Sequence, residues 1–94
     1  MKIYKNNWSS RECYFVEWMR QKGRCFGVGV LRYSTSRGKD RWVVRRDYSY
    51  KDSDVDDPFQ FTIVGNINLE KLISHAVLEA VETKNKHREE KQRK

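Results

Sequence analysis

The sequence predicts an α+β fold in which a four-stranded antiparallel sheet, connected as a meander, is followed by one C-terminal helix packed on one face. Apolar and polar residues alternate in four segments separated by polar turns, and beyond Gly65 the apolar spacing changes to three and four. The chain has 94 residues, which is enough for one core. We expect a single ββββα domain over residues 1–81 and a charged, helical or frayed extension over residues 82–94.

The four expected strands are set apart by turn signals. Residues 11–20 and 24–33 are rich in aromatic and β-branched side chains, and the turn residues 21–23 lie between them. The third expected strand, residues 41–50, follows a polar loop that contains glycine. The fourth, residues 59–64, follows an acidic connection that ends in proline. These signals favour hairpins between successive strands.

The expected helix is marked by one apolar stripe. Its members are Leu69, Leu72, Ile73, Ala76, Val77, Ala80 and Val81. They recur at steps of three and four, which places them on one side of a helix. Asn66 or Asn68 can cap its N-terminus. Past the stripe there is no glycine or proline, and Lys86 with Glu90 and Glu90 with Lys94 are spaced to pair, so the helix can continue.

Alternation divides the strand residues between two faces of the sheet. The residues expected to face the helix are Tyr14, Val16, Trp18, Phe26, Val28, Val30, Trp42, Val44, Phe59, Phe61 and Ile63. Tyr48 has the same parity as Trp42 and Val44 and is placed on their side. The opposite face is expected to be open to solvent or to a partner.

The positive charge is concentrated in the middle of the chain. Lys and Arg number 20 against 13 Asp and Glu, a formal net charge of +7. Residues 23–50 hold seven Lys or Arg against only Asp40 and Asp47, which leaves a net charge of +5. Clustered cations suit a polyanion, because each neutralised phosphate releases counterions. A basic surface that serves only solubility is the plainer alternative.

The predicted pairing gathers cations and rings on the open face. With Tyr33 opposite Arg41, Phe15 is expected beside Gly29 and Arg45, next to bare backbone at Gly27 and Gly29. The residues expected to contact nucleic acid are Phe15, Arg32, Tyr33, Arg37, Lys39, Arg41, Arg45 and Arg46. Aromatic rings stack on bases and arginines bind phosphate or guanine. We therefore expect a DNA- or RNA-binding protein, with the strandedness left open.

The predicted topology is similar to that of known nucleic-acid binders, although no sequence motif is shared. Four antiparallel strands followed by a helix resemble the half-unit of Whirly and Pur-type proteins, whose curved sheets stack bases. Residues 24–81 also resemble the three strands and helix of plant ethylene-response-type and phage integrase N-terminal domains, which place a sheet in the major groove. The resemblance implies a sheet as the binding surface and assigns no individual residue.

A protein partner is the alternative. A small phage-type or mobile-element regulator could block an acidic surface on a host protein, with Phe15, Leu31 and Val43 as apolar anchors and arginines at the rim. A homodimer through the open face is compatible with either function.

Other functions have little support in the sequence. The two histidines, His75 and His87, fall in the helix and its extension, and no phosphate-binding loop or metal-ligand spacing occurs. We expect no catalytic residue, no metal and no cofactor. With the turn at residues 21–23, Cys25 is expected opposite Met19 and Cys13 opposite Leu31, about six strand positions away. Both cysteines are therefore expected to be free thiols. With no membrane-length apolar run or signal peptide in view, we expect a cytoplasmic protein.

Overall fold

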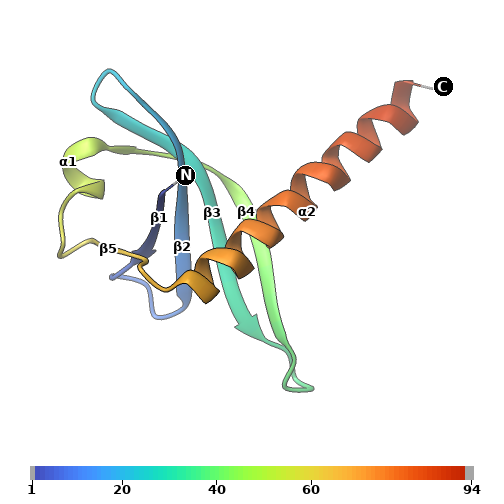
Figure 1. The fold of residues 1–94 in the computed structure, drawn as a ribbon, viewed down its shortest axis with the longest axis horizontal. Coiled ribbons are helices and arrows are strands. Elements are labelled where there is room, and N and C mark those ends of the chain that lie inside the picture. Colours follow the sequence, from blue (N-terminus) through green and yellow to red (C-terminus); the bar gives the residue numbers. More distant parts are fainter. Residues whose placement is uncertain (1, 93–94) are drawn as a thin grey trace.

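The fold is described by a computed structural model that covers the backbone of residues 2–92 and the side chains of residues 2–84. Its elements are β1 (Lys2–Asn6), β2 (Glu12–Gln21), β3 (Arg24–Ser34), β4 (Asp40–Lys51), α1 (Asp52–Val55), β5 (Phe61–Ile63) and α2 (Ile67–Gln92). The α+β class, the antiparallel sheet and the C-terminal helix are confirmed (Figure 1). The expected number of strands is wrong, because the described sheet has five.

The strand order in the sheet is β4-β3-β2-β1-β5, and each neighbouring pair is antiparallel. The additional strand, β1, shows no alternation of apolar and polar residues. Its adjacent residues Ile3 and Tyr4 are both buried, because each packs in a cluster on a different face of the sheet. The last strand pairs with β1 and not with β4, as Phe61 lies opposite Asn6. The order therefore departs from the meander on which the resemblance to Whirly and Pur-type proteins was based.

The β2–β3 hairpin closes at its turn signal, with a loop of two residues instead of the expected three. Lys22 and Gly23 form the two-residue loop with φ angles of 51° and 78°, the left-handed values that such tight hairpins use. Cys13 lies opposite Leu31, as expected, and both cysteines are free. Cys25 lies opposite Arg20 instead of Met19, because the loop has two residues instead of three, and the extra residue Trp18 in β2 restores the expected register beyond it.

A second bulge lies in β4. Val28 is opposite Asp47 and Val30 is opposite Val44, so two β4 residues, Arg45 and Arg46, face the single residue between Val28 and Val30. An extra residue shifts the alternation of everything beyond it by one position. Tyr48 and Tyr50 therefore pack in a different cluster from Trp42 and Val44, and the expectation that Tyr48 shares their face is wrong.

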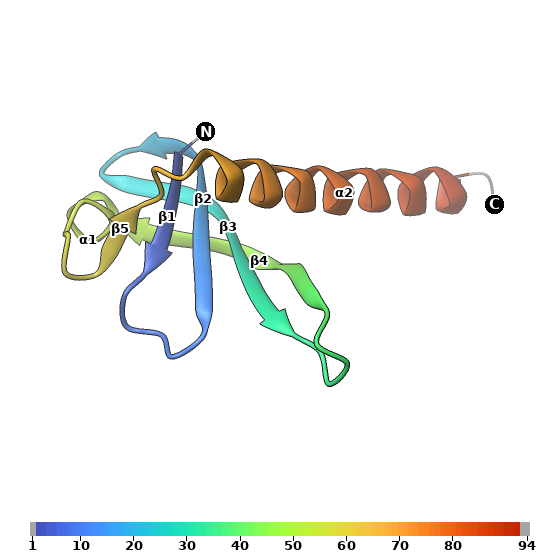
Figure 2. The same cartoon turned by 60° about the horizontal axis from the view of Figure 1, so that its bottom comes forward.

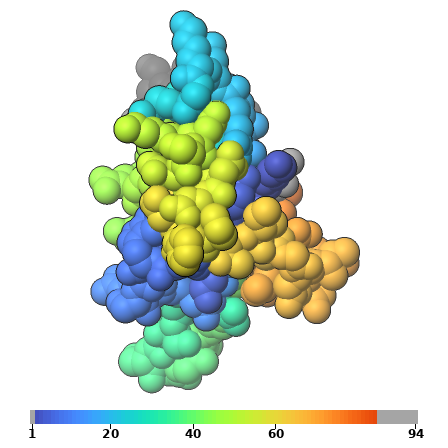
Figure 3. All heavy atoms as spheres, turned by 90° about the vertical axis from the view of Figure 1, so that its left-hand side faces the viewer, coloured from blue at the N-terminus to red at the C-terminus, as the bar shows by residue number. Residues whose placement is uncertain are grey.

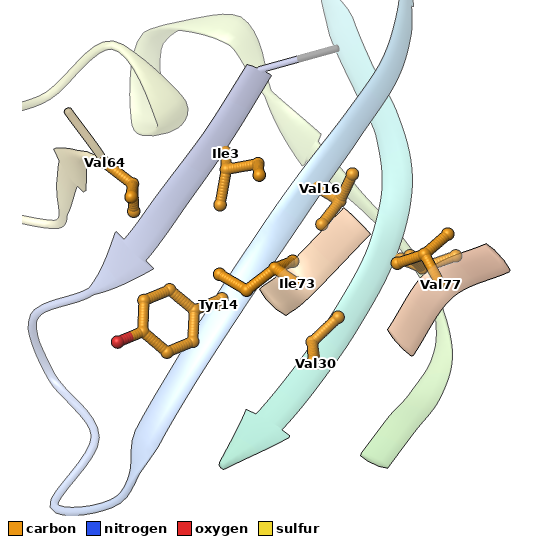
Figure 4. Close-up of a cluster of buried hydrophobic side chains, with 8 residues drawn as sticks. Ile3, Tyr14, Val16, Val30, Val64, Ile73 and Val77 are labelled. Carbon is orange, nitrogen blue, oxygen red and sulfur yellow. The ribbon is translucent and has the colours of Figure 1, made fainter. Parts of the chain in front are cut away.

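The main core lies between the sheet and α2 (Figure 4). Its buried members are Ile3, Tyr14, Val16, Val28, Val30, Val64, Ile73 and Val77, with Trp42, Val44 and Leu69 packed against them. Asn66 caps α2, since its Oδ1 accepts hydrogen bonds from the backbone N–H groups of Asn68 and Leu69 at 2.9 and 3.4 Å. Six of the eleven expected sheet residues are thus confirmed in this layer, together with Leu69, Ile73 and Val77 of the helix stripe.

Some residues expected in this layer lie elsewhere. Trp18, Phe59 and Ile63 are 49%, 90% and 70% exposed. Trp18 is displaced by its bulge, and β5 has only three residues at the edge of the sheet. Phe26 is half-buried, and Phe61 is buried in a different cluster. On α2, Leu72 and Val81 are exposed, because the stripe is wider than its contact with the sheet.

A second cluster covers the other face of the sheet. It consists of Tyr4, Phe15, Cys25, Val55 and Phe61, with Tyr48 and Tyr50 packed against it. The segment from α1 towards β5 lies over this end of the molecule (Figure 3, yellow-green to yellow). Phe15 is only 1% exposed, and its ring meets that of Tyr50 at 5.0 Å. The expectation that Phe15 lies on an open surface is therefore wrong.

Arg20 links α1 to the sheet. Its guanidinium donates two hydrogen bonds to Asp56, at 2.8 and 2.9 Å, one to Glu17 and one to the hydroxyl of Tyr4. The acidic segment was expected only to connect two strands, but it packs over the second cluster, where its Val55 is buried.

Helix α2 crosses the sheet and then projects beyond it (Figures 1 and 2). It runs unbroken from Ile67 to Gln92, so the helix continues beyond Val81. The expected pairs of Lys86 with Glu90 and of Glu90 with Lys94 lie outside the described side chains. Neither described helix combines the length and the apolar character that crossing a membrane requires.

Candidate nucleic-acid interface

Two adjoining hollows lie between the β1–β2 loop, β3 and β4. The first has a volume of about 330 Å³ and the second about 710 Å³, and both are lined by Arg11, Leu31 and Arg45. The β1–β2 loop and the β3–β4 hairpin project away from α2 (Figure 2). We call this surface the arginine groove; its members are Trp8, Arg11, Leu31, Tyr33, Val43, Arg45 and Tyr48.

Two arginines of the groove have no partner among the described side chains. Arg45 is one of the two residues at the β4 bulge, and Arg11 precedes β2 in a loop where its backbone N–H donates to Ser9 Oγ at 3.2 Å. Neither guanidinium makes a hydrogen bond or ion pair within residues 2–84. The same holds for Arg41, which lies opposite Tyr33 near the start of β4. These charges are available to an anion.

Arg32, by contrast, is already engaged. It donates to both carboxylate oxygens of Asp40, at 2.9 and 3.1 Å, lies 3.4 Å from Glu12, and stacks over Trp42 at 5.1 Å. The hydrogen bond from Arg32 holds the pKa of Asp40 below its usual value. Arg32 borders the second hollow, but its guanidinium is bound by its own neighbours.

The other predicted contacts are divided between the groove and its surroundings. Tyr33 is 43% exposed and lines the second hollow. Arg46 lies beside the groove, where its guanidinium stands 5.1 Å from the centre of the Tyr48 ring and donates to its hydroxyl at 3.2 Å. Arg37 and Lys39 are exposed in the β3–β4 loop, beyond the hollows.

Three groove residues were not predicted from the sequence. Trp8 and Arg11 lie in the β1–β2 loop, where no alternation of apolar and polar residues indicates which way a side chain points. The only sequence signal for a binding site there was an aromatic residue close to a cation. Trp8 is 55% exposed, with its ring 4.8 Å from Phe61 at 85°. Tyr48 was missed because a bulge leaves no sign in the pattern of alternation.

The floor of the groove is apolar and closed. Leu31 is buried and Val43 is half-buried. The expected strip of bare backbone is absent from this floor: a side chain on Gly29 would collide with the ring of Tyr48, and one on Gly27 would collide with the backbone of Val16. The glycines are therefore sites of close packing and offer no open surface.

The groove has a single sign of charge. No Asp or Glu lines either hollow. Glu12 and Asp40, which line a neighbouring hollow with Arg32 and Tyr33, are both paired with Arg32. An anionic ligand would meet cations without repulsion from a lining carboxylate.

Comparisons with protein-family models, with curated proteins and with solved structures give no match.

Proposed function

We propose that the protein binds nucleic acid through the arginine groove and acts as a binding protein, not as an enzyme. One observation supports this most directly: Arg11 and Arg45 have no partner among the described side chains and line both hollows, which no carboxylate lines. Arg41, opposite Tyr33 in the neighbouring strand, is likewise without a described partner. Leaving several arginines unpaired on one surface is typical of phosphate binding.

Exposed rings accompany these cations. Tyr33 lies opposite Arg41, and Trp8 lines the same hollow as Arg11 and Arg45. Aromatic rings beside phosphate-binding arginines form a platform on which bases stack, with each stacked base contributing about 1–3 kcal/mol. The combination favours nucleic acid over a simple anion.

A protein partner with an acidic surface is the weaker candidate. That function required Phe15, Leu31 and Val43 as exposed apolar anchors. Phe15 and Leu31 are 1% and 8% exposed, and Val43 is half-buried. Hot spots of protein interfaces need such side chains to be accessible, so little apolar surface is left for the partner.

A salt titration tests the proposal. We expect the logarithm of the binding constant to fall linearly with the logarithm of salt concentration, with a slope near −0.7 per phosphate contacted on a single strand or about −0.9 on a duplex. Binding that does not change between low and moderate salt would rule the proposal out. Capture of one stable protein partner after nuclease treatment, with no oligonucleotide binding, would favour the acidic protein surface instead.

A further inference from the structure

The first hollow of the arginine groove has the size of a small-molecule site. It has a volume of about 330 Å³ and lies between the β1–β2 loop and β4. Pockets for small organic ligands span roughly 300–1,000 Å³. There is room here for one nucleobase, whereas a duplex is far too wide to enter.

Aromatic rings form one side of this hollow. The rings of Tyr48 and Tyr50 are nearly parallel, 11° apart in plane, with centroids separated by 5.9 Å. The ring of Trp8 lies 6.3 Å from that of Tyr50 and is held against Phe61 by an edge contact, while the residue remains 55% exposed. Rings already held in place lose little conformational entropy when a base stacks on them.

Asn6 supplies an unused hydrogen-bond acceptor. It ends β1 opposite Phe61 and lines the hollow, and its Oδ1 is buried without a hydrogen-bond partner among the described residues. Buried polar atoms are nearly always paired, so this orphan is a candidate acceptor for a ligand once the Asn6 side chain turns its Oδ1 into the hollow. The exocyclic amines of cytosine and adenine are donors of this kind.

Arg11 and Arg45 line the same hollow, and both lack a partner within residues 2–84. A base seated between the rings has its own phosphates on either side, at the rim. The two guanidinium groups are available for those phosphates, as charge-assisted hydrogen-bond donors.

We propose that the hollow receives one base of a single-stranded nucleic acid. Trp8 and Tyr48 contact the ring of the base, Asn6 Oδ1 accepts a hydrogen bond from its exocyclic amine, and Arg11 and Arg45 bind the adjacent phosphates. The inference rests on the proposed function and adds strandedness and base preference to it. Bases in a duplex are stacked and paired, so they enter such a site only after being flipped out.

The test compares labelled single strands of deoxycytidine and deoxyuridine, each of about 12 nucleotides. The two bases differ at C4, where cytosine has an amine and uracil a carbonyl, and at N3, where cytosine has a lone pair and uracil an N–H. We expect the cytidine strand to bind about fivefold more tightly, the effect of one net hydrogen bond. Asn6→Leu keeps the size of the side chain and removes the acceptor, so the preference should vanish. Trp8→Ala should weaken both strands about tenfold.

Each outcome has a distinct meaning. Equal binding of the two strands by the wild type, or an unchanged preference in Asn6→Leu, would overturn the base site while salt-dependent binding leaves the proposed function standing. An unlabelled duplex that competes as well as a single strand would also overturn it. If no oligonucleotide binds at low salt, the proposed function fails as well. Circular dichroism confirms that each variant is folded.

Discussion

The ring of Tyr48 lies directly on Gly29 of the neighbouring strand. A methyl group at Gly29 would collide with Cε2 and would stand 2.9 Å from Cδ2 of that ring. The contact exists because the β4 bulge turns Tyr48 away from α2 and towards Phe15. The bulge in β4 therefore places the Tyr48 ring so that it covers Gly29 and lines the arginine groove.

Gly29→Ala should destabilise the protein, because the added methyl group forces the Tyr48 ring out of its packing. Overpacking of this kind costs about 1–3 kcal/mol of unfolding free energy. Gly27→Ala should cost more, since its methyl group would meet the backbone of Val16, which a side-chain rotation cannot relieve. Gly65→Ala is the control, as nothing lies within 4 Å of its added methyl group. Urea unfolding measures all three, and equal midpoints would refute the packing described here.

Asp56→Asn should make stability less sensitive to acid. Hydrogen bonds from Arg20 hold the pKa of Asp56 below its usual value of 3.8. A carboxyl with a depressed folded-state pKa stabilises the fold above its unfolded pKa, and this contribution is lost as the pH falls through the folded value. Between about pH 5 and pH 2 the wild type should therefore lose more unfolding free energy than Asp56→Asn. Parallel losses in thermal melts would contradict a stabilising Arg20–Asp56 pair.

Cys25 should resist alkylation in the native protein. Burial raises the pKa of its thiol to about 12, and hydrogen bonds to Glu17 and Asp52 add to the shift. Only the thiolate reacts readily, so iodoacetamide should modify Cys25 only after unfolding. Mass spectrometry with and without denaturant measures this. Rapid modification of Cys25 under native conditions would show that the cluster beneath α1 is open.

Removing residues 85–94 should leave the domain stable. Within residues 67–84 of α2, Val77 is the last buried residue, and the helix projects past the sheet beyond it (Figure 1). We expect the unfolding free energy to change by no more than about 0.5 kcal/mol, as for surface substitutions. A matched cut before Ile73, whose side chain is fully buried, should abolish folding. A large loss of unfolding free energy on removal of residues 85–94 alone would show that part of the core lies in the extension.

Local patterns predicted the elements whose side chains alternate or recur regularly. Period and parity correctly placed Tyr14, Val16, Val28 and Val30 in the sheet core, and Leu69, Ile73 and Val77 on the helix face that packs against it. The two bulges could not be predicted, because the residues before and after a bulge still alternate, and the sequence does not mark the extra residue at which the faces exchange. The pairing of β5 with β1 depends on contacts distant in sequence, which no local pattern encodes.

The candidate site was predicted only where it depends on that regular pattern. Tyr33 and Arg41 lie opposite each other, as the hairpin register required. Arg32 has the right charge, but its acidic neighbours could be identified only in three dimensions. Phe15 has the parity of the open face, yet it is covered by a segment distant from it in the chain.

The most direct test of nucleic-acid binding by the arginine groove compares Arg11→Ala/Arg45→Ala with Lys71→Ala/Lys84→Ala by fluorescence anisotropy on a labelled single strand. Both variants lose two positive charges, but Lys71 and Lys84 are exposed on α2, away from the groove. We predict that the arginine variant binds at least about tenfold more weakly, with its salt slope reduced by about 1.4, while the lysine variant stays close to wild type. A folded arginine variant that binds as tightly as the lysine variant would contradict the assignment.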